Sequence, residues 1–295
     1  MHSLPPPCRA VFHTGNAVHD MSLFLDLIDI TGPIRAAASH RSLLWQFTKR
    51  NISVRYRGSM LGLVWSFVHP LMMLCVYTFV FSVVFKARWG TDINGGRGAF
   101  AIVMFCGMAL YSSFSESISN CCRVVTDNPN LVTKVIFPLE ILPLAQTLST
   151  VILGLVWFIL LFFGTIFIFG KLSFTMLLLP LILLPLFLFT LGVSYFVASF
   201  GVYVRDTSYM VQVILQILFF MTPIFYPIDA VPERFRWPLQ LNPLTILIEE
   251  ARKVFLYGKL PNWVFLGCAF LASVIVLQLG FVWFSKTKKG FADVL

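Results

Sequence analysis

The chain has 295 residues, of which 58% are hydrophobic and only 12% are charged, and its net charge is +9. An ordinary soluble domain carries about 25% charged residues, and so apolar a chain lacks the polar residues that would cover its surface in water. The composition therefore excludes a soluble protein and predicts an all-α membrane protein. The basic residues form no positively charged surface away from the predicted membrane boundaries, so we expect no nucleic acid as a partner.

Residues 1–38 are predicted to be a partly disordered leader. The first part of this segment contains Pro, Gly and His but lacks the apolar core of a signal peptide. The sequence leaves both Met1 and Met21 open as the true start of the protein.

Residues 39–57 are predicted to form an amphipathic helix at the membrane interface. At 100° per residue, one arc of this helix is polar and most of the rest is apolar. Arg57 falls on the polar arc, whereas Arg55 falls on the apolar one. Arg55 has two interpretations: its stem lies in lipid while its charge reaches water, or its guanidinium fork binds an anionic ligand.

Long stretches with almost no charged residues predict six transmembrane helices, since about 20 apolar residues are enough to cross a bilayer. Their ranges are about 58–85, 98–122, 141–170, 172–204, 207–228 and 260–285. Thirteen of the 22 Lys and Arg residues fall on the side that holds both termini. This bias predicts that both ends, including the tail 286–295, are cytoplasmic.

The first predicted span follows the basic residues without an evident turn. Gly58 and Gly62 have the GxxxG spacing that permits close helix contact, and Pro70 is expected to kink the helix. The adjacent His69 is either a satisfied polar residue or a proton relay. In the second span, Glu116 is either a functional acid or a structural one paired with nearby serines and Arg123.

Two segments between the spans have unusual compositions. On the cytoplasmic side, residues 120–143 predict a short surface helix that exposes Leu131, Val135 and Phe137. These exposed apolar side chains imply that a partner protein covers them. On the outer side, residues 221–262 contain six prolines among many apolar residues. This combination favours re-entrant helices between spans 5 and 6.

The chain contains no GxxxxGK[ST] phosphate loop and no Cys or His spacing suited to zinc. We therefore expect neither nucleotide hydrolysis nor a metal site in this chain.

Four blocks of sequence resemble the permease subunits of type-2 ABC exporters that move lipid-linked polysaccharides. In chain order they are RYRGSMLGLVWSFVHPLMMLCVYTFVFSVVF, NPNLVTKVIFPLEILPLA, VRDTSYMVQVILQILFFMTPIFYP and LNPLTILIEEARKVFL. The resemblance covers about residues 40–285 and implies a type-2 ABC transmembrane domain over 58–285. One departure is His69, where asparagine is commoner in relatives.

The resemblance implies the partners and the location. Two copies of the chain pair around a channel in the cytoplasmic (inner) membrane, among its lipids, and each carries a separate ATP-binding cassette subunit. ATP and Mg belong to that subunit, and no cofactor belongs to this chain. The substrate is a polyprenyl-pyrophosphate-linked polysaccharide, most simply of the O-antigen type, although capsule and teichoic acid polymers are not separated from it.

The resemblance also implies roles for particular residues. Arg55 and Arg57 are expected to receive the lipid pyrophosphate, and Trp65, Tyr77 and Phe81 are candidates for an aromatic channel or gate. Coupling to the ATPase is assigned to Asn130, Leu131, Lys134, Phe137 and Pro138. The outer re-entrant segment is represented by Pro223, Tyr226, Pro227, Asn242, Pro243 and Arg252.

Three other interpretations remain. A type-2 exporter of another substrate would share the same fold. A proton- or ion-coupled transporter would need more ionisable groups inside the membrane than His69 and Glu116. A membrane glycosyltransferase would need acidic catalytic residues, for which Asp229, Glu233, Glu249 and Glu250 are available.

Overall fold

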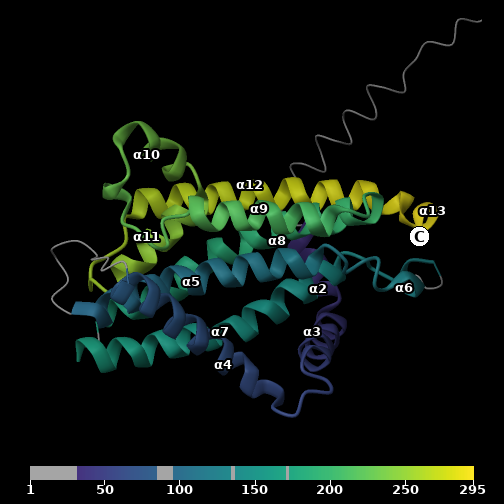
Figure 1. Cartoon of the computed structure of the whole chain (residues 1–295). Helices are drawn as coiled ribbons and strands as arrows, with labels where there is room; N and C mark the ends of the chain where they lie inside the picture. The colour runs from purple at the N-terminus through teal and green to yellow at the C-terminus, as the bar shows by residue number, and fades with distance from the viewer. Residues whose placement is uncertain (1–31, 85–95, 134–136, 171–172) are drawn as a thin grey trace, which may run out of the picture.

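The computed structural model describes residues 32–84, 96–133, 137–170 and 173–295. Within these ranges the chain is made of helices and turns and contains no strand (Figure 1). Lys134, Val135 and residues 1–31 of the expected leader lie outside the described residues. The all-α prediction is confirmed for the described chain.

Five helical segments are long and apolar enough to cross a membrane. They are Gly62–Phe81, Gly98–Cys121, Ile141–Phe169, Phe174–Tyr203 and Trp263–Val294. The α-helices that make up most of their length are α4 (Trp65–Tyr77), α5 (Gly96–Cys121), α7 (Ile141–Phe169), α8 (Leu179–Tyr203) and α12 (Trp263–Thr287). The protein is therefore a multi-pass membrane protein.

Shorter helices lie at the two ends of this bundle and before it. At one end are α6 (Pro129–Thr133) and α13 (Phe291–Val294), and at the opposite end are α10 (Glu233–Gln240) and α11 (Pro243–Phe255) (Figure 1). We call these the α6 end and the α10 end. Before the bundle come α2 (Gly32–Ser39) and α3 (Arg41–Arg55), so a helix begins inside the segment 1–38 that was predicted as a leader.

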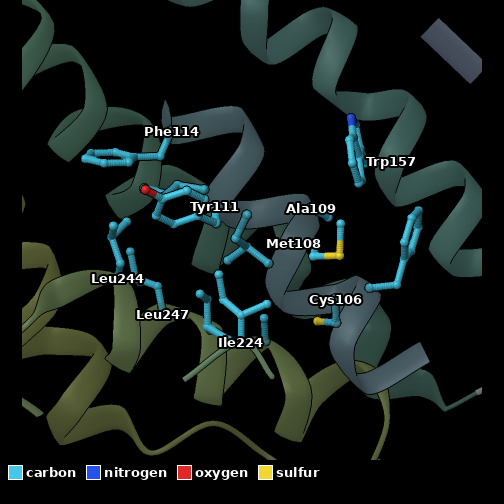
Figure 2. Close-up of a cluster of buried hydrophobic side chains, with 14 of the residues drawn as sticks. Cys106, Met108, Ala109, Tyr111, Phe114, Trp157, Ile224, Leu244 and Leu247 are labelled. Atoms are coloured by element: carbon cyan, nitrogen blue, oxygen red, sulfur yellow. The ribbon is translucent and has the colours of Figure 1, made fainter. Parts of the chain in front are cut away.

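Helix α5 is the centre of the bundle. Along its apolar window 83% of residues are buried, compared with 6% along the segment that contains α4. Figure 2 shows side chains of α5 lying between Trp157 on one side and Ile224, Leu244 and Leu247 on the other. The hydroxyl of Tyr111 on α5 donates to the backbone oxygen of Leu215, which ties α9 (Thr207–Met221) to this core.

Helices α8 and α12 are in close backbone contact because glycines face each other. A Cβ atom placed on Gly280 would lie 2.1 Å from the backbone oxygen of Gly192. Any larger residue at either position would have to push the two helices apart.

The fifth predicted span, 207–228, is only partly helical. Helix α9 ends at Met221, so its 15 residues are fewer than the roughly 20 of a full-length span. The reason is local: Thr222 is extended, with φ −89° and ψ 134°, as a residue before proline prefers. The described chain therefore has five long candidate spans and one short apolar helix in place of six equal spans.

The prediction that Gly58 and Gly62 support a close helix contact is wrong. Both have positive φ, at 85° and 51°, and nothing lies within 4 Å of a Cβ placed on either. They form the turn between α3 and α4, because glycine adopts this backbone conformation without steric cost. Helix α4 runs through Pro70, and the departure from α-helical geometry follows at Thr78–Val84, which is a π-helix.

Candidate functional site

A cleft of about 440 Å³ opens between the C-terminal end of α3, α4, α5 and α7. We call it the entrance cleft. It combines aromatic rings, hydroxyl groups, one carboxylate and one guanidinium. Its lining residues are Arg55, Tyr56, Trp65, Ser66, His69, Pro70, Ser112, Ser115, Glu116, Leu153 and Trp157.

An ion pair between Arg55 and Glu116 crosses the entrance cleft from α3 to α5. Both side chains are partly open to solvent, with 38% and 29% of their surface exposed. The partner expected for Glu116 was Arg123, but the Nε of Arg123 donates to Ser208 at 3.1 Å instead. Glu116 therefore pairs with Arg55 where Arg123 was expected, and the charge of Arg55 is balanced within the chain.

The floor of the entrance cleft is aromatic. The ring of His69 approaches Trp157 edge-on, with their centroids 6.3 Å apart. Trp157 in turn stacks on Phe105 of α5 at 5.3 Å. The described ring contact of His69 is aromatic, while Glu116 lines the same cleft.

A second cleft of about 380 Å³ adjoins the first and shares Arg55 and Leu153 with it. We call it the amide cleft, because four amide side chains line it. It lies between α3, the end of α5, the turn before α6, and the beginning of α7. Its other lining residues are Arg50, Asn51, Val54, Asn120, Val124, Asp127, Asn128, Gln146 and Ser149.

The amide cleft is the part of the site that the sequence did not reveal. Its four amides come from four elements, namely α3, the end of α5, the turn before α6 and the beginning of α7, and amides are ordinary residues in any one of them. The one available signal was Gln146 with Ser149, two polar residues three positions apart at the start of an apolar span, and hence on one helical face.

The two arginines that were predicted to act together are separated in the structure. Arg55 lines both clefts. Arg57 follows α3, is exposed, and lines neither of them. Within the described residues Arg57 forms no ion pair, so its charge is open to a ligand from outside.

The three aromatic gate candidates also fall into two places. Trp65 lines the entrance cleft. Tyr77 and Phe81 lie further along, where Phe81 stacks on Phe225 at 4.7 Å and Tyr77 lies 5.4 Å from the same ring. The cluster around Phe225 therefore joins the end of the first long helix to the segment after α9.

The segment 128–140 at the α6 end contains the residues predicted to couple to an ATPase, and we call it the docking segment. Asn130 is exposed, whereas Leu131, Phe137 and Pro138 are half-buried. Phe137 packs on Phe47 of α3, with ring centroids 5.2 Å apart. The expectation that Leu131 and Phe137 are exposed is wrong, because both pack against a buried hydrophobic cluster, and α3 covers Phe137 through Phe47.

The segment from Pro223 to Asn262 at the α10 end is folded around a buried arginine. Arg252 is fully buried and donates to the backbone oxygens of Pro223 at 2.7 Å and Ile224 at 2.9 Å. The same guanidinium pairs with Glu249 at 2.7 Å. Arg252 thus fixes the break after α9 to α11.

Other residues that were predicted for this segment end or begin its helices. Asn242 accepts a hydrogen bond from the backbone N–H of Leu244 at 3.0 Å and so caps α11. Pro243 occupies the first turn of α11, and Pro227 precedes the short 3-10 helix Ile228–Ala230. The hydroxyl of Tyr226 donates back to Phe220 at 3.0 Å.

Comparison with known protein families gives a match over most of this architecture. The profile of the family described as "ABC-2 type transporter" matches residues 42–256, which is more than half of the chain. The chain belongs to the ABC-2 type transporter family. In an ABC-2 transporter this membrane domain is the permease part, and the matched region holds no ATPase domain.

Curated relatives of this ABC-2 permease carry a more specific name. An O-antigen export system permease protein RfbA from Klebsiella pneumoniae is 28% identical over 258 residues, which cover 86% of this chain and 95% of the relative. A protein of the same name from Myxococcus xanthus is 29% identical over 266 residues, covering 88% of this chain and 98% of the relative. The similarity thus extends over nearly the full length of both relatives.

Proposed function

We propose that this ABC-2 permease exports a lipid-linked polysaccharide of the O-antigen type across the cytoplasmic membrane, driven by a separate ATP-binding subunit. The observation that carries the proposal is the pair of joined clefts beside α3. One offers tryptophan faces, and the other offers amide and hydroxyl groups. The names of the full-length relatives support the same class of substrate.

The two clefts suit the chemistry of a sugar. The CH faces of a sugar ring pack on flat apolar rings, which Trp65 and Trp157 supply in the entrance cleft. Sugar hydroxyls both donate and accept hydrogen bonds, and so do the side-chain amides of Asn120 and Gln146 in the amide cleft. Neither cleft demands one particular sugar.

The lipid pyrophosphate requires cations, and Arg57 and Arg55 meet this need in different ways. Arg57 is exposed at the turn between α3 and α4, so an anion reaches it without displacing a partner. Arg55 already pairs with Glu116. An anion at Arg55 therefore competes with Glu116, and in this proposal the carboxylate keeps the guanidinium oriented until substrate arrives.

Uncovered apolar faces support assembly as a homodimer. Only 6% of the apolar window of the α4 segment is buried, and α9 exposes a row of large apolar residues. These include Met210, Val213, Ile214, Ile217 and Phe220. A second copy packed against α4 and α9 would cover part of this surface and enclose a channel between the two chains.

The remaining assignments follow from this arrangement. The docking segment, with the exposed Asn130 and Lys134 outside the described residues, is proposed to contact the ATP-binding subunit from the cytoplasm. Both termini are then cytoplasmic, and the α10 end faces outward, where the segment from Pro223 to Arg252 shapes the exit. A cysteine placed at Asp229 should be labelled from outside the cell by a membrane-impermeant maleimide. Labelling only after the cells are opened would reverse this orientation.

Export by the reconstituted complex tests the function itself. The permease and its ATP-binding subunit are placed in vesicles with a polyprenyl-pyrophosphate-linked polysaccharide, and ATP-dependent transfer of polymer across the bilayer is measured. ATP turnover without stimulation by that substrate would leave a type-2 exporter of another substrate. Glycosyl transfer by the purified chain with a polyprenyl donor would instead indicate a membrane glycosyltransferase.

A further inference from the structure

The last residues of the chain, 288–295, lie at the α6 end of the bundle and pack on other elements there. Helix α13 lies against α6 and α8 (Figure 1). We call residues 288–295 the C-terminal hook. A helix of four residues has no stability of its own in water, so contacts with the rest of the protein hold it in place.

One aromatic side chain anchors the C-terminal hook. Phe291 is fully buried, and its ring lies 5.5 Å from that of Phe284 and 5.9 Å from that of Tyr203. The hydroxyl of Tyr203 donates to the backbone oxygen of Thr287 at 2.8 Å. The end of α12 and the hook are thus fastened to the end of α8.

An ion pair then connects the C-terminal hook to the docking segment. Lys288 pairs with the carboxylate of Glu140, which is the last residue before α7. The Glu140 side chain is 11% exposed and that of Lys288 is 35% exposed. The backbone oxygen of Glu140 also accepts a hydrogen bond from Tyr195 of α8 at 3.1 Å. The far end of the docking segment is therefore held by side chains of α8 and of the hook.

Helix α3 holds the docking segment at other points. Besides the packing of Phe47 on Phe137, Arg50 donates to the side-chain oxygen of Asn128 at 3.4 Å. Leu131, Val132 and Phe137 pack against the same hydrophobic cluster that contains Phe284 and Phe291. The docking segment is thus braced from α3 and from the C-terminal hook.

Helix α6 of the docking segment needs such braces because it is short. It has five residues, too few for a helix that is stable by itself in water. Contacts with longer helices therefore hold it in place.

We propose that the C-terminal hook is a positioning element for the docking segment, acting through Lys288 and Phe291. With the hook in place, movement of the ATP-binding subunit against α6 is passed on to α7 and α3. Without it, part of that movement is absorbed at Glu140. This inference rests on the proposed function, in which the docking segment contacts the ATP-binding subunit.

Breaking the ion pair while keeping both side chains' bulk tests the proposal. Lys288→Met and Glu140→Gln are compared with Lys289→Met, which removes the charge of the exposed neighbour. At matched amounts of the reconstituted complex, export per ATP hydrolysed should fall about fivefold in the first two variants, as expected for coupling of moderate strength. It should stay unchanged in the control.

The charge-swapped double variant, Lys288→Glu with Glu140→Lys, decides whether the pair itself matters. It should restore at least half of the export per ATP, and it still tests the proposal if a single variant fails to accumulate. A parallel loss of ATP turnover and export, or no restoration by the swap, would overturn the positioning role.

A cross-linking measurement separates failure of the hook from failure of the proposed function. Asn130→Cys, in the wild-type background, is cross-linked to the ATP-binding subunit with a short bifunctional reagent. Cross-linking together with unchanged coupling in the hook variants would refute the hook alone. Absence of cross-linking would refute the docking assignment on which the hook depends.

Discussion

Glu116→Gln is the substitution that best separates a substrate-binding role of Arg55 from a structural one. In the wild type, Glu116 pairs with Arg55 across the entrance cleft. Glu116→Gln removes the competing charge but keeps the size of the side chain. If Arg55 binds the pyrophosphate, this variant should bind substrate more tightly, whereas Arg55→Ala should bind it more weakly.

The exposure of the two side chains sets the magnitudes. With 38% and 29% of their surface exposed, the Arg55–Glu116 pair resembles a solvent-screened one, for which about 0.2–1 kcal/mol is typical. Glu116→Gln should therefore lower the half-maximal substrate concentration by about 1.5- to 5-fold. A charge-assisted contact to substrate contributes about 1.5–3 kcal/mol, so Arg55→Ala should raise that concentration by about 10- to 100-fold.

Substrate-stimulated ATP hydrolysis by the reconstituted complex is the assay, with each variant at the same protein amount. Arg55→Lys keeps the charge without the fork and should fall between wild type and Arg55→Ala. Lys49→Ala is the matched control, because Lys49 is an exposed cation on the same helix that lines neither cleft. Its half-maximal substrate concentration should not change.

The direction of the Glu116→Gln effect on the half-maximal substrate concentration decides whether substrate competes with Glu116 for Arg55. If Glu116→Gln and Arg55→Ala both raise the half-maximal concentration, the ion pair is structural, and the reasoning that substrate competes with Glu116 is refuted. If neither variant changes it, the pyrophosphate does not bind at Arg55.

Arg252→Met should destabilise the protein by about 3–5 kcal/mol, because it leaves the Pro223 and Ile224 oxygens and Glu249 without their donor. Arg252→Lys should not restore this stability. A midpoint of thermal unfolding in detergent close to that of wild type, for either variant, would contradict the prediction. Gly280→Ala should cost about 1–3 kcal/mol, since its Cβ would meet Gly192 at 2.1 Å. The control Gly267→Ala, with nothing within 4 Å of its Cβ, should be neutral or stabilising in the same unfolding measurement. Phe137→Ser should lower export per ATP by removing the ring that packs on Phe47, while Phe137→Leu should retain most of it; equal effects of the two would argue against packing as the cause.

The sequence by itself determined the class of the protein and most of its helices. Apolar runs are local features, and a helix that crosses lipid must be apolar along its whole length, so the ends of α5, α7 and α12 lie within a few residues of their predicted positions. The ordered sequence blocks likewise indicated the ABC-2 family, which the family match over residues 42–256 confirms. The prolines of the segment after α9 correctly predicted that its helices are short and interrupted.

Only the tertiary structure decided which side chains meet. Arg50 and Asn128 are 78 positions apart, and Lys288 and Glu140 are 148 apart, so no local pattern links them. The same holds for the Arg55–Glu116 pair, for the packing of Phe137 against α3, and for the amides that gather from four elements. Such contacts depend on how each helix is rotated and which neighbour it packs against. Hydropathy fixes the length of a membrane helix, but it leaves that rotation and that neighbour undetermined.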